Sequence, residues 1–440
     1  MTDLEERTSP STDAVAEVRA WLEENWDPDI TVGEWWERLG LSGWAAPGLP
    51  ENAYGKGLNR NDSVAVQNAI AEFGALSAPG GLGLMLAAPT IAAHGTQEQI
   101  DLYVRDIVTG QKAWCQLFSE PSAGSDLAGI QTRAIKDGDE WVVTGQKVWT
   151  SGGQVADLGM LIARTDADVP KHQGISYFAI DMHQKGVEIR PLVEMTGHAM
   201  FNEVFLEEAT TPDSTLIGGL NNGWAVANTT LMNERASLGS GGGHAAASAA
   251  TPGTVVKDLE KRVGDFVSGG EKVTARRRRG GGGGMFSGSY NLLVDLAKGN
   301  GKINDPSIRQ DLMRLHTYNE LGRMQNLRIK GGGVVPGAAN IAKLQMSNIV
   351  RMSRDVGLAI IGPFGTLHGY TGEQTEANNA ATGNPFAGMV TGTALYAQAP
   401  PIYGGTDQVQ KNIIGERVLG LPKEANNDKT AAFKDLPKNA

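Results

Sequence analysis

The spacing of hydrophobic residues changes twice along the chain. Residues 13–110 repeat apolar side chains every three or four positions, as at Val18 and Leu22, which is the period of an amphipathic helix. Residues 112–218 alternate at a period of two, which is typical of strands. Helical spacing returns after Gly223 and continues almost to the end. The pattern predicts a helical region, a β region and a second helical region, an α+β protein of several domains.

The central β region contains strand-like runs separated by turn residues. The dipeptide Asp137-Gly138 joins the runs 132–136 and 140–144 and predicts a hairpin. Further extended runs cover 175–180, 187–192 and 203–207. Short strands of this kind favour a small antiparallel β-barrel.

Four long helical patterns follow the β region, and their default packing is an antiparallel four-helix bundle. They cover residues 224–238, 290–297, 306–330 and 340–358. A last helix is expected from Asp407 towards Gly420, after a Gly-Gly-Thr break.

These patterns divide the chain into three predicted domains: 1–111 (helical), 112–218 (β-barrel) and 219–440 (helical bundle). The third is expected to carry a flexible insertion rich in Gly and Arg at about 239–289, where glycine runs surround Arg276 to Arg279. A phosphate-binding role for these arginines is conceivable, but a solvated loop is the preferred interpretation, since consecutive like charges repel.

Composition narrows the function classes. The chain has 440 residues, a net charge of −10 and a pI near 5.3, which argues against general affinity for nucleic acid or anionic membranes. Cys115 is the only cysteine, so no internal disulfide can form and a structural zinc site is not expected. An acidic beginning without an apolar stretch argues against a signal peptide, and no run of eighteen apolar residues predicts a membrane span. A cytoplasmic protein is expected.

Candidate chemistry is densest between Ala113 and Gly153. Small and turn-forming residues interrupt an extended, aromatic-rich stretch there, which leaves backbone N–H groups free to face a ligand. Trp149 and Ser151 then place a flat ring and a hydroxyl at the end of a strand. These features suit a planar polar ligand.

Two motifs in this stretch carry a family resemblance. The run FSEPSAGSDLAG, starting at Phe118, and the run GQKVWTSGG, starting at Gly145, resemble two successive motifs of the acyl-CoA dehydrogenases, in the same order and at the expected separation. The resemblance implies the helix, barrel, helix architecture already predicted. It also implies FAD as cofactor and an acyl-CoA thioester as substrate, from which a base removes the alpha proton while the beta hydrogen leaves as hydride.

The position of the base departs from the commonest family pattern. Many members carry a glutamate in a Tyr-Glu-Gly-Thr run, but here the run is Tyr403-Gly404-Gly405-Thr406. One branch supplies the base from the first helix of the C-terminal bundle instead, and Glu234 matches that position. Residues 224, 227, 231 and 234 follow helical spacing, which puts Glu234 on an apolar stripe, where an unpaired carboxylate is costly. The alternative is a salt bridge at the edge of the stripe, for instance with Arg235.

The resemblance also implies further contacts. The backbone N–H of Gly404 would bind the thioester carbonyl, and Arg235 and Tyr403 would lie near the substrate. The implied cofactor contacts are Phe118, Ser119, Gly124, Ser125, Trp149, Ser151, Lys302, Thr406 and Gln408. For each hydroxyl taken alone, a turn or capping role is the competing interpretation. A glycine-containing turn at 361–369 lies where relatives contact flavin across a subunit interface, so a homodimer or homotetramer is expected.

The resemblance implies an FAD-dependent acyl-CoA dehydrogenase that passes electrons to an electron-transferring flavoprotein. Two alternatives remain open. A flavin-dependent monooxygenase or oxidase could share the fold, and a non-catalytic subunit of a hetero-oligomeric dehydrogenase could share the sequence motifs. The motifs do not choose among branched, long-chain and polycyclic acyl groups.

Overall fold

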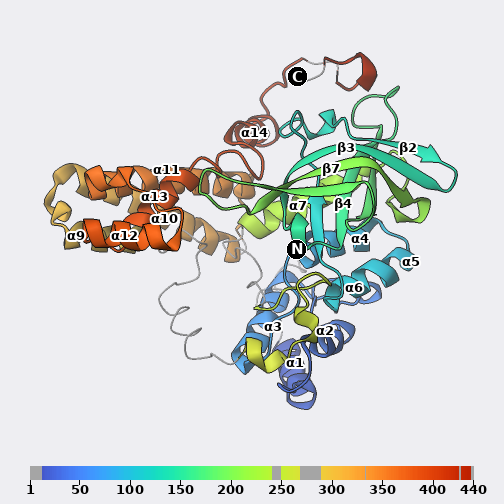
Figure 1. Cartoon of the computed structure of the whole chain (residues 1–440), viewed down its shortest axis with the longest axis horizontal. Helices are drawn as coiled ribbons and strands as arrows, with labels where there is room; N and C mark the ends of the chain where they lie inside the picture. The colour runs from blue at the N-terminus through green and yellow to red at the C-terminus, as the bar shows by residue number, and fades with distance from the viewer. Residues whose placement is uncertain (1–11, 240–248, 268–288, 332, 426–427, 438–440) are drawn as a thin grey trace, which may run out of the picture.

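The computed structural model describes residues 12–239, 249–267, 289–331, 333–425 and 428–437. Arg276 to Arg279 and most of the glycine runs around them lie outside the described residues. Figure 1 shows the N-terminal helices below a central sheet, with a group of long helices projecting to one side.

The N-terminal region is helical, as predicted. Its α-helices are α1 (Thr12–Asn25), α2 (Val32–Leu41), α3 (Arg60–Phe73), α4 (Ala88–His94), α5 (Gln97–Gln99) and α6 (Arg105–Val108). A capping box of Thr31 and Glu34 starts α2 by satisfying backbone N–H groups at its first turn. The fully buried Trp35 and Trp36 of α2 donate their indole N–H groups to the carbonyls of residues 76 and 77, at 2.8 and 2.9 Å. Paired indoles therefore fill the core of this region without an unsatisfied donor.

The β region forms one sheet. Its strands are β1 (Trp114–Leu117), β2 (Arg133–Asp137), β3 (Glu140–Ser151), β4 (Leu158–Arg164), β5 (Ile175–Asp181), β6 (Val187–Leu192), β7 (Phe201–Pro212) and β8 (Leu216–Ile217). The hairpin is confirmed: β2 and β3 are antiparallel, Asp137 pairs with Glu140, and Gly138 adopts a φ of +59° that few other residues tolerate.

The prediction of an antiparallel barrel needs correction. The strand order is β6-β7-β3-β2-β4-β5-β8, and among the described residues no pairing joins β6 to β8. Two pairings are parallel, β1 with β4 and β2 with β4. The sheet is therefore open and mixed. The alternation of apolar residues predicts single strands but does not specify that β1 and β2 run parallel to β4.

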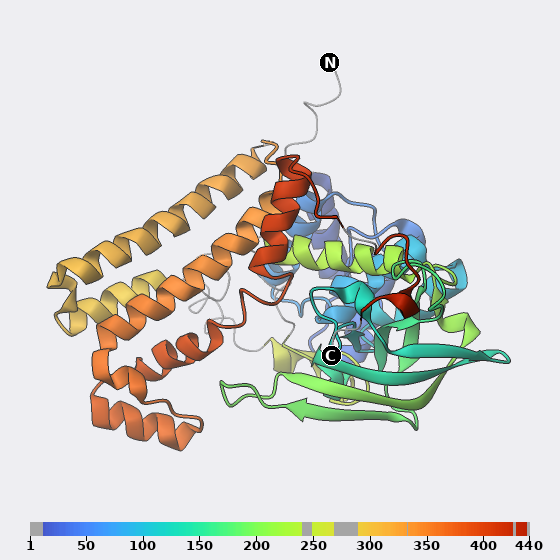
Figure 2. The same ribbon diagram turned by 90° about the horizontal axis from the view of Figure 1, so that it is seen from above.

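The C-terminal helices are α7 (Gly223–Gly239), α9 (Ser289–Gly299), α10 (Pro306–Lys330), α11 (Ala338–Ile361), α12 (Gly372–Thr382), α13 (Ala387–Tyr396) and α14 (Asp407–Ile413). The bundle core contains buried side chains of α9, α10, α11 and α13. Its membership differs from the prediction, because Val226 and Ala227 of α7 belong to the core shared with the N-terminal helices and the sheet. Figure 2 shows α9 to α13 extending away from the sheet, with α7 lying over the body of the molecule.

Residues 249–267, a part of the predicted insertion, pack against the N-terminal helices. The backbone N–H of Val32 donates to the carbonyl of Lys261 at 2.8 Å, and Gly253 donates to Gly110 at 2.8 Å. Arg262 pairs with Asp29. A flexible insertion therefore does not describe residues 249–267, which are docked by backbone hydrogen bonds. Within the described chain, no helix has the length and apolar character needed to cross a bilayer.

Candidate active site

Trp149 owes its outward position to an irregularity in β3. Trp141, Val143 and Lys147 are buried at every second position, so a regular strand would also turn Trp149 inward. The pairing of β3 with β7 shifts register between Lys147 and Thr150, and Trp149 adopts a φ of +61°. Its side chain is 56% exposed, with its ring edge-to-face with Phe201 at 5.7 Å. A strained conformation at a bulky residue presents a flat ring at the surface, beside the half-buried Ser151.

Ser119 and Phe118 are held next to this strand by a buried ion pair. The ammonium of Lys147 contacts Glu120 at 2.9 Å and the Phe118 carbonyl at 3.1 Å, and the N–H of Val148 donates to the Ser119 carbonyl at 2.9 Å. Lys147 is fully buried. The segment after β1 is thus joined to the second half of β3, which brings Phe118 and Ser119 close to the part of β3 that carries Trp149 and Ser151.

The turn after Glu120 leaves room for a ligand beside the backbone. Gly124 and Ser125 are exposed, and a Cβ at Gly124 would meet no atom within 4 Å. Beyond the turn, Glu120 accepts hydrogen bonds from the N–H groups of Gln131 and Thr132, at 2.7 and 3.0 Å. The turn is therefore open at its tip and fixed at its base.

Glu234 lies on α7, which two side-chain hydrogen bonds anchor to α4. The Thr230 hydroxyl contacts Thr90 of α4 at 3.0 Å, and the Thr229 hydroxyl contacts the His94 ring at 2.7 Å. Burial raises the pKa of Glu234 above its ordinary value, an effect that a hydrogen bond with the side chain of Gln116 and the charge of Arg235 partly offset. A carboxyl whose pKa is raised in this way is suited to accept a proton near neutral pH.

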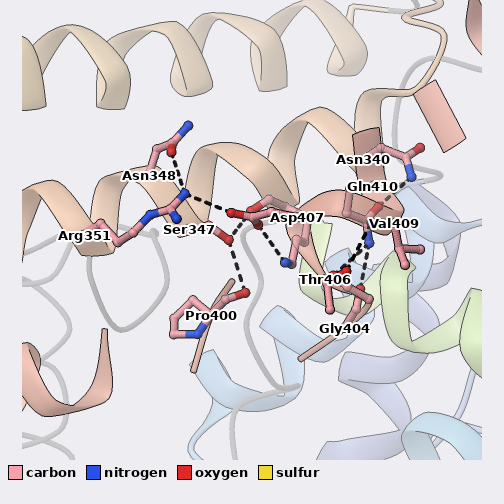
Figure 3. A network of polar contacts seen from close by, with 12 residues as sticks. Asn340, Ser347, Asn348, Arg351, Pro400, Gly404, Thr406, Asp407, Val409 and Gln410 are labelled. Carbon is pink, nitrogen blue, oxygen red and sulfur yellow. Dashed lines mark hydrogen bonds and ion pairs between the residues drawn. The ribbon is translucent and has the colours of Figure 1, made fainter. Parts of the chain in front are cut away.

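The run from Tyr403 to Gln410 is held by a polar network that Figure 3 shows. Gly404 and Gly405 have positive φ angles of +62° and +80°, and the side-chain amide of Gln410 donates to their carbonyls at 2.8 and 3.3 Å. Asn340 of α11 donates to the Gln410 oxygen at 2.6 Å. Thr406 caps α14 by accepting from the N–H of Val409. The backbone of Gly404 is thereby fixed relative to α11.

Asp407 ties the same run to α11 by charge. Its carboxylate contacts Lys343 at 3.0 Å and Arg351 at 2.9 Å, and Asp407 is 5% exposed (Figure 3). Burial would raise the pKa of Asp407, but hydrogen bonds from Lys343 and Ser347 and the charges of Lys343 and Arg351 lower it below its ordinary value. The carboxylate therefore stays ionised and helps to hold the start of α14 in place.

Arg235 and Gly404 line one cavity although they are far apart in the sequence. The lining of this cavity is completed by Ala339, Ala342, Lys343, Met346 and Gln410. Tyr403 lies beside it, and its hydroxyl bonds to the Tyr396 hydroxyl at 2.7 Å. The helix that carries Glu234 and the Gly-Gly-Thr run therefore meet at a common hollow.

Two predicted cofactor contacts lie apart from this group. Lys302 is exposed in the turn between α9 and α10. Figure 2 shows the connection between these two helices at the outer end of the projecting bundle. Gln408 is exposed on α14. A single chain does not bring Lys302 to Trp149, and the subunit contact that could do so remains a prediction.

Several residues that shape the site were not identified from sequence. They are Gln116, Glu120, Lys147, Asn340, Lys343, Arg351, Asp407 and Gln410. A signal existed for Lys147, because the alternation in β3 places a charged residue at an inward position. For Asn340 and Arg351 the signal is absent, since their partners are more than fifty residues away.

Comparisons with known proteins identify the family. Residues 11–111 match the family model described as acyl-CoA dehydrogenase, N-terminal domain, and residues 115–209 match the one described as acyl-CoA dehydrogenase, middle domain. The chain is 33% identical to acyl-CoA dehydrogenase IpdE1 of Mycobacterium tuberculosis, over 93% of this chain and 97% of the relative. It is 34% identical to acyl-CoA dehydrogenase FadE34 of the same organism, over 93% of this chain and 48% of that protein.

Solved structures share the fold. A structure titled Tcur3481-Tcur3483 steroid ACAD has a TM-score of 0.64 at 24% identity, and the match covers 94% of this chain and 98% of that one. The ChsE4-ChsE5 complex from Mycobacterium tuberculosis has a TM-score of 0.63 at 23% identity, with 96% and 100% covered. The matching family models and the full-length similarity to a named dehydrogenase show that this chain belongs to the acyl-CoA dehydrogenase family.

Proposed function

We propose that this protein is an FAD-dependent acyl-CoA dehydrogenase in which Glu234 is the catalytic base. The observation that carries the proposal is the setting of Glu234. It is a shielded carboxyl with a raised pKa, and the residue that follows it lines a cavity together with Gly404. The usual glutamate beside Tyr403 is absent, and Glu234 is the carboxyl on the helix that brings Arg235 to this cavity.

The reaction removes two hydrogens from the acyl chain. Glu234 takes the proton from the carbon alpha to the thioester carbonyl, and the N–H of Gly404 stabilises the negative charge that develops on the carbonyl oxygen. FAD held beside Trp149 would supply the acceptor for the beta hydrogen, which leaves as hydride as the alpha,beta double bond forms. An electron-transferring flavoprotein would be the final acceptor of the two electrons.

The described residues fit a flavin. The exposed face of Trp149 offers a stacking surface, Ser119 and Ser151 offer hydroxyls beside it, and the open turn at Gly124 and Ser125 leaves backbone room for the pyrophosphate. Thr406 and Gln408 would approach from the α14 side. Lys302 would reach a flavin only from a neighbouring subunit, which supports a dimeric or larger assembly. We also propose that the chain divides into three domains, with boundaries at about residues 111 and 218.

The test is spectroscopic. The purified chain is expected to be yellow, with a visible flavin absorbance that bleaches when an acyl-CoA is added without oxygen. A protein that binds no flavin, or whose flavin no thioester bleaches, would instead fit a non-catalytic subunit. Rapid reoxidation by air with product bound would favour an oxidase or monooxygenase.

The choice of acyl-CoA can follow the comparisons. One structural neighbour is titled Tcur3481-Tcur3483 steroid ACAD, and another is titled as the ChsE4-ChsE5 complex. The first acyl-CoAs to be assayed should therefore include thioesters of steroid side chains as well as straight-chain and branched thioesters. Co-expression with neighbouring dehydrogenase chains tests whether a hetero-oligomer is needed.

A further inference from the structure

Residues 428–435 lie against the middle domain, far in sequence from the loops that they contact. The N–H of Phe433 donates to the Val169 carbonyl at 2.9 Å, and the N–H of Lys434 donates to the Ala167 carbonyl at 3.0 Å. Figures 1 and 2 show this red segment crossing from α14 to the strands and loops of the sheet. We call residues 428–435 the clasp.

The clasp supplies partners to two buried cations. Asp428 contacts the ammonium of Lys171 at 2.6 Å, and the Lys171 side chain is 8% exposed. The ring of Phe433 covers the guanidinium of Arg164, with 3.7 Å between the guanidinium carbon and the ring centroid. A buried cation needs such partners, since the loss of its hydration is costly.

The same two cations hold the loop that follows Gly124 and Ser125. Lys171 contacts both carboxylate oxygens of Asp126 at 2.9 Å. Arg164 donates to the carbonyls of Ala128 at 2.6 Å and Ile130 at 3.4 Å. Lys171 and Arg164 therefore lie between the clasp and this loop and contact both of them.

The charges in this stack favour a fixed loop. Burial would lower the pKa of Lys171, but its hydrogen bonds to Asp428 and Asp126 outweigh burial and raise it, so Lys171 remains charged. Lys171 also shares its charge between two carboxylates. Loss of Asp428 would leave Lys171 with the carboxylate of Asp126 alone of these two and would loosen the loop that Asp126 belongs to.

We propose that the clasp sets the affinity for FAD, by holding residues 126–130 so that Gly124 and Ser125 face the pyrophosphate. This inference rests on the proposed function, because it takes the turn at Gly124 as part of the flavin site. Asp428 and Phe433 are positioning residues that act through Lys171 and Arg164. They need not touch the cofactor.

The experiment titrates FAD into the apoprotein of the full chain and follows the quenching of flavin fluorescence. Asp428→Asn should raise the Kd for FAD by about five- to tenfold, the size expected when one charged hydrogen bond is lost. Phe433→Ala should act in the same direction, and Phe433→Tyr, which keeps a ring over Arg164, should restore most of the affinity. The matched control is Asp435→Asn, an exposed carboxylate of the clasp, which should leave the Kd unchanged.

Further readouts separate this role from general stability. Once FAD is saturating, Asp428→Asn should show wild-type kcat and KM for the acyl-CoA. A Kd within twofold of wild type for Asp428→Asn, or tighter binding because a freed Lys171 meets the pyrophosphate, would overturn the inference. A wild-type chain that binds no FAD would instead overturn the proposed function.

Discussion

Lys147 and Glu120 form a buried ion pair, with 2.9 Å between the ammonium and the nearer carboxylate oxygen, and the two side chains are 0% and 5% exposed. The pair joins the end of β1 to the end of β3, the two segments that carry the family motifs. It therefore couples the stability of the middle sheet to the shape of the proposed flavin site.

Lys147→Met should lower the free energy of unfolding by about 3–5 kcal/mol, because Glu120 would keep a buried charge without its cation. Urea unfolding measures the loss. Lys136→Met is the matched control, since Lys136 belongs to the same sheet but pairs with Asp213 at the surface, with its side chain 41% exposed, and should cost about 1 kcal/mol or less. The double variant Lys147→Met with Glu120→Gln should regain part of the loss. A single-variant loss no larger than that of the control would contradict the coupling.

Glu234→Gln should keep the flavin spectrum and lower kcat by roughly a thousandfold or more, as expected when a general base is removed. Because the pKa of Glu234 is raised in the folded state, its contribution to stability is greatest at low pH and falls as the pH rises through the raised pKa. The variant should therefore be at least as stable as wild type at pH 7. Anaerobic bleaching and thermal unfolding measure both effects, and wild-type bleaching would show that the base is another residue.

Gln116→Leu should move the acidic limb of the kcat/KM profile to higher pH. The hydrogen bond with Gln116 lowers the pKa of Glu234, so its removal lets burial raise that pKa further. The ionised base then appears only at higher pH. Gln398→Leu, a change at an exposed glutamine after α13, should leave the profile unchanged. A limb that stays in place or moves to lower pH would contradict this role for Gln116.

Gln410→Leu should lower kcat by roughly ten- to a hundredfold, since the peptide of Gly404 would lose the amide that bonds its carbonyl. Steady-state kinetics with saturating FAD measures the change. Lys411→Leu, at an exposed position of the same helix, should be close to wild type. Unchanged kcat in the Gln410 variant would mean that the two glycines hold their conformation without it.

Local patterns predicted most elements well, and the exceptions have physical causes. The hairpin at Gly138 and the helices from 306 to 330 and from 338 to 361 depend on neighbours in sequence, such as a positive φ or an apolar stripe. The bundle membership of α7 was not predictable in this way. Its apolar residues pack on distant helices and strands, and one amphipathic stripe does not specify which partner covers it.

By itself, the sequence determined the order of helical and extended segments, the two motifs around Ser119 and Trp149, and the absence of a glutamate at position 404. Only the tertiary structure decided the outward turn of Trp149, the common cavity of Arg235 and Gly404, and the pairing of Lys171 with both Asp428 and Asp126. The physical reason is distance along the chain. Periodicity and turn chemistry act within a few residues, whereas a bulge, a cavity wall and a shared counter-ion depend on which distant segments pack together.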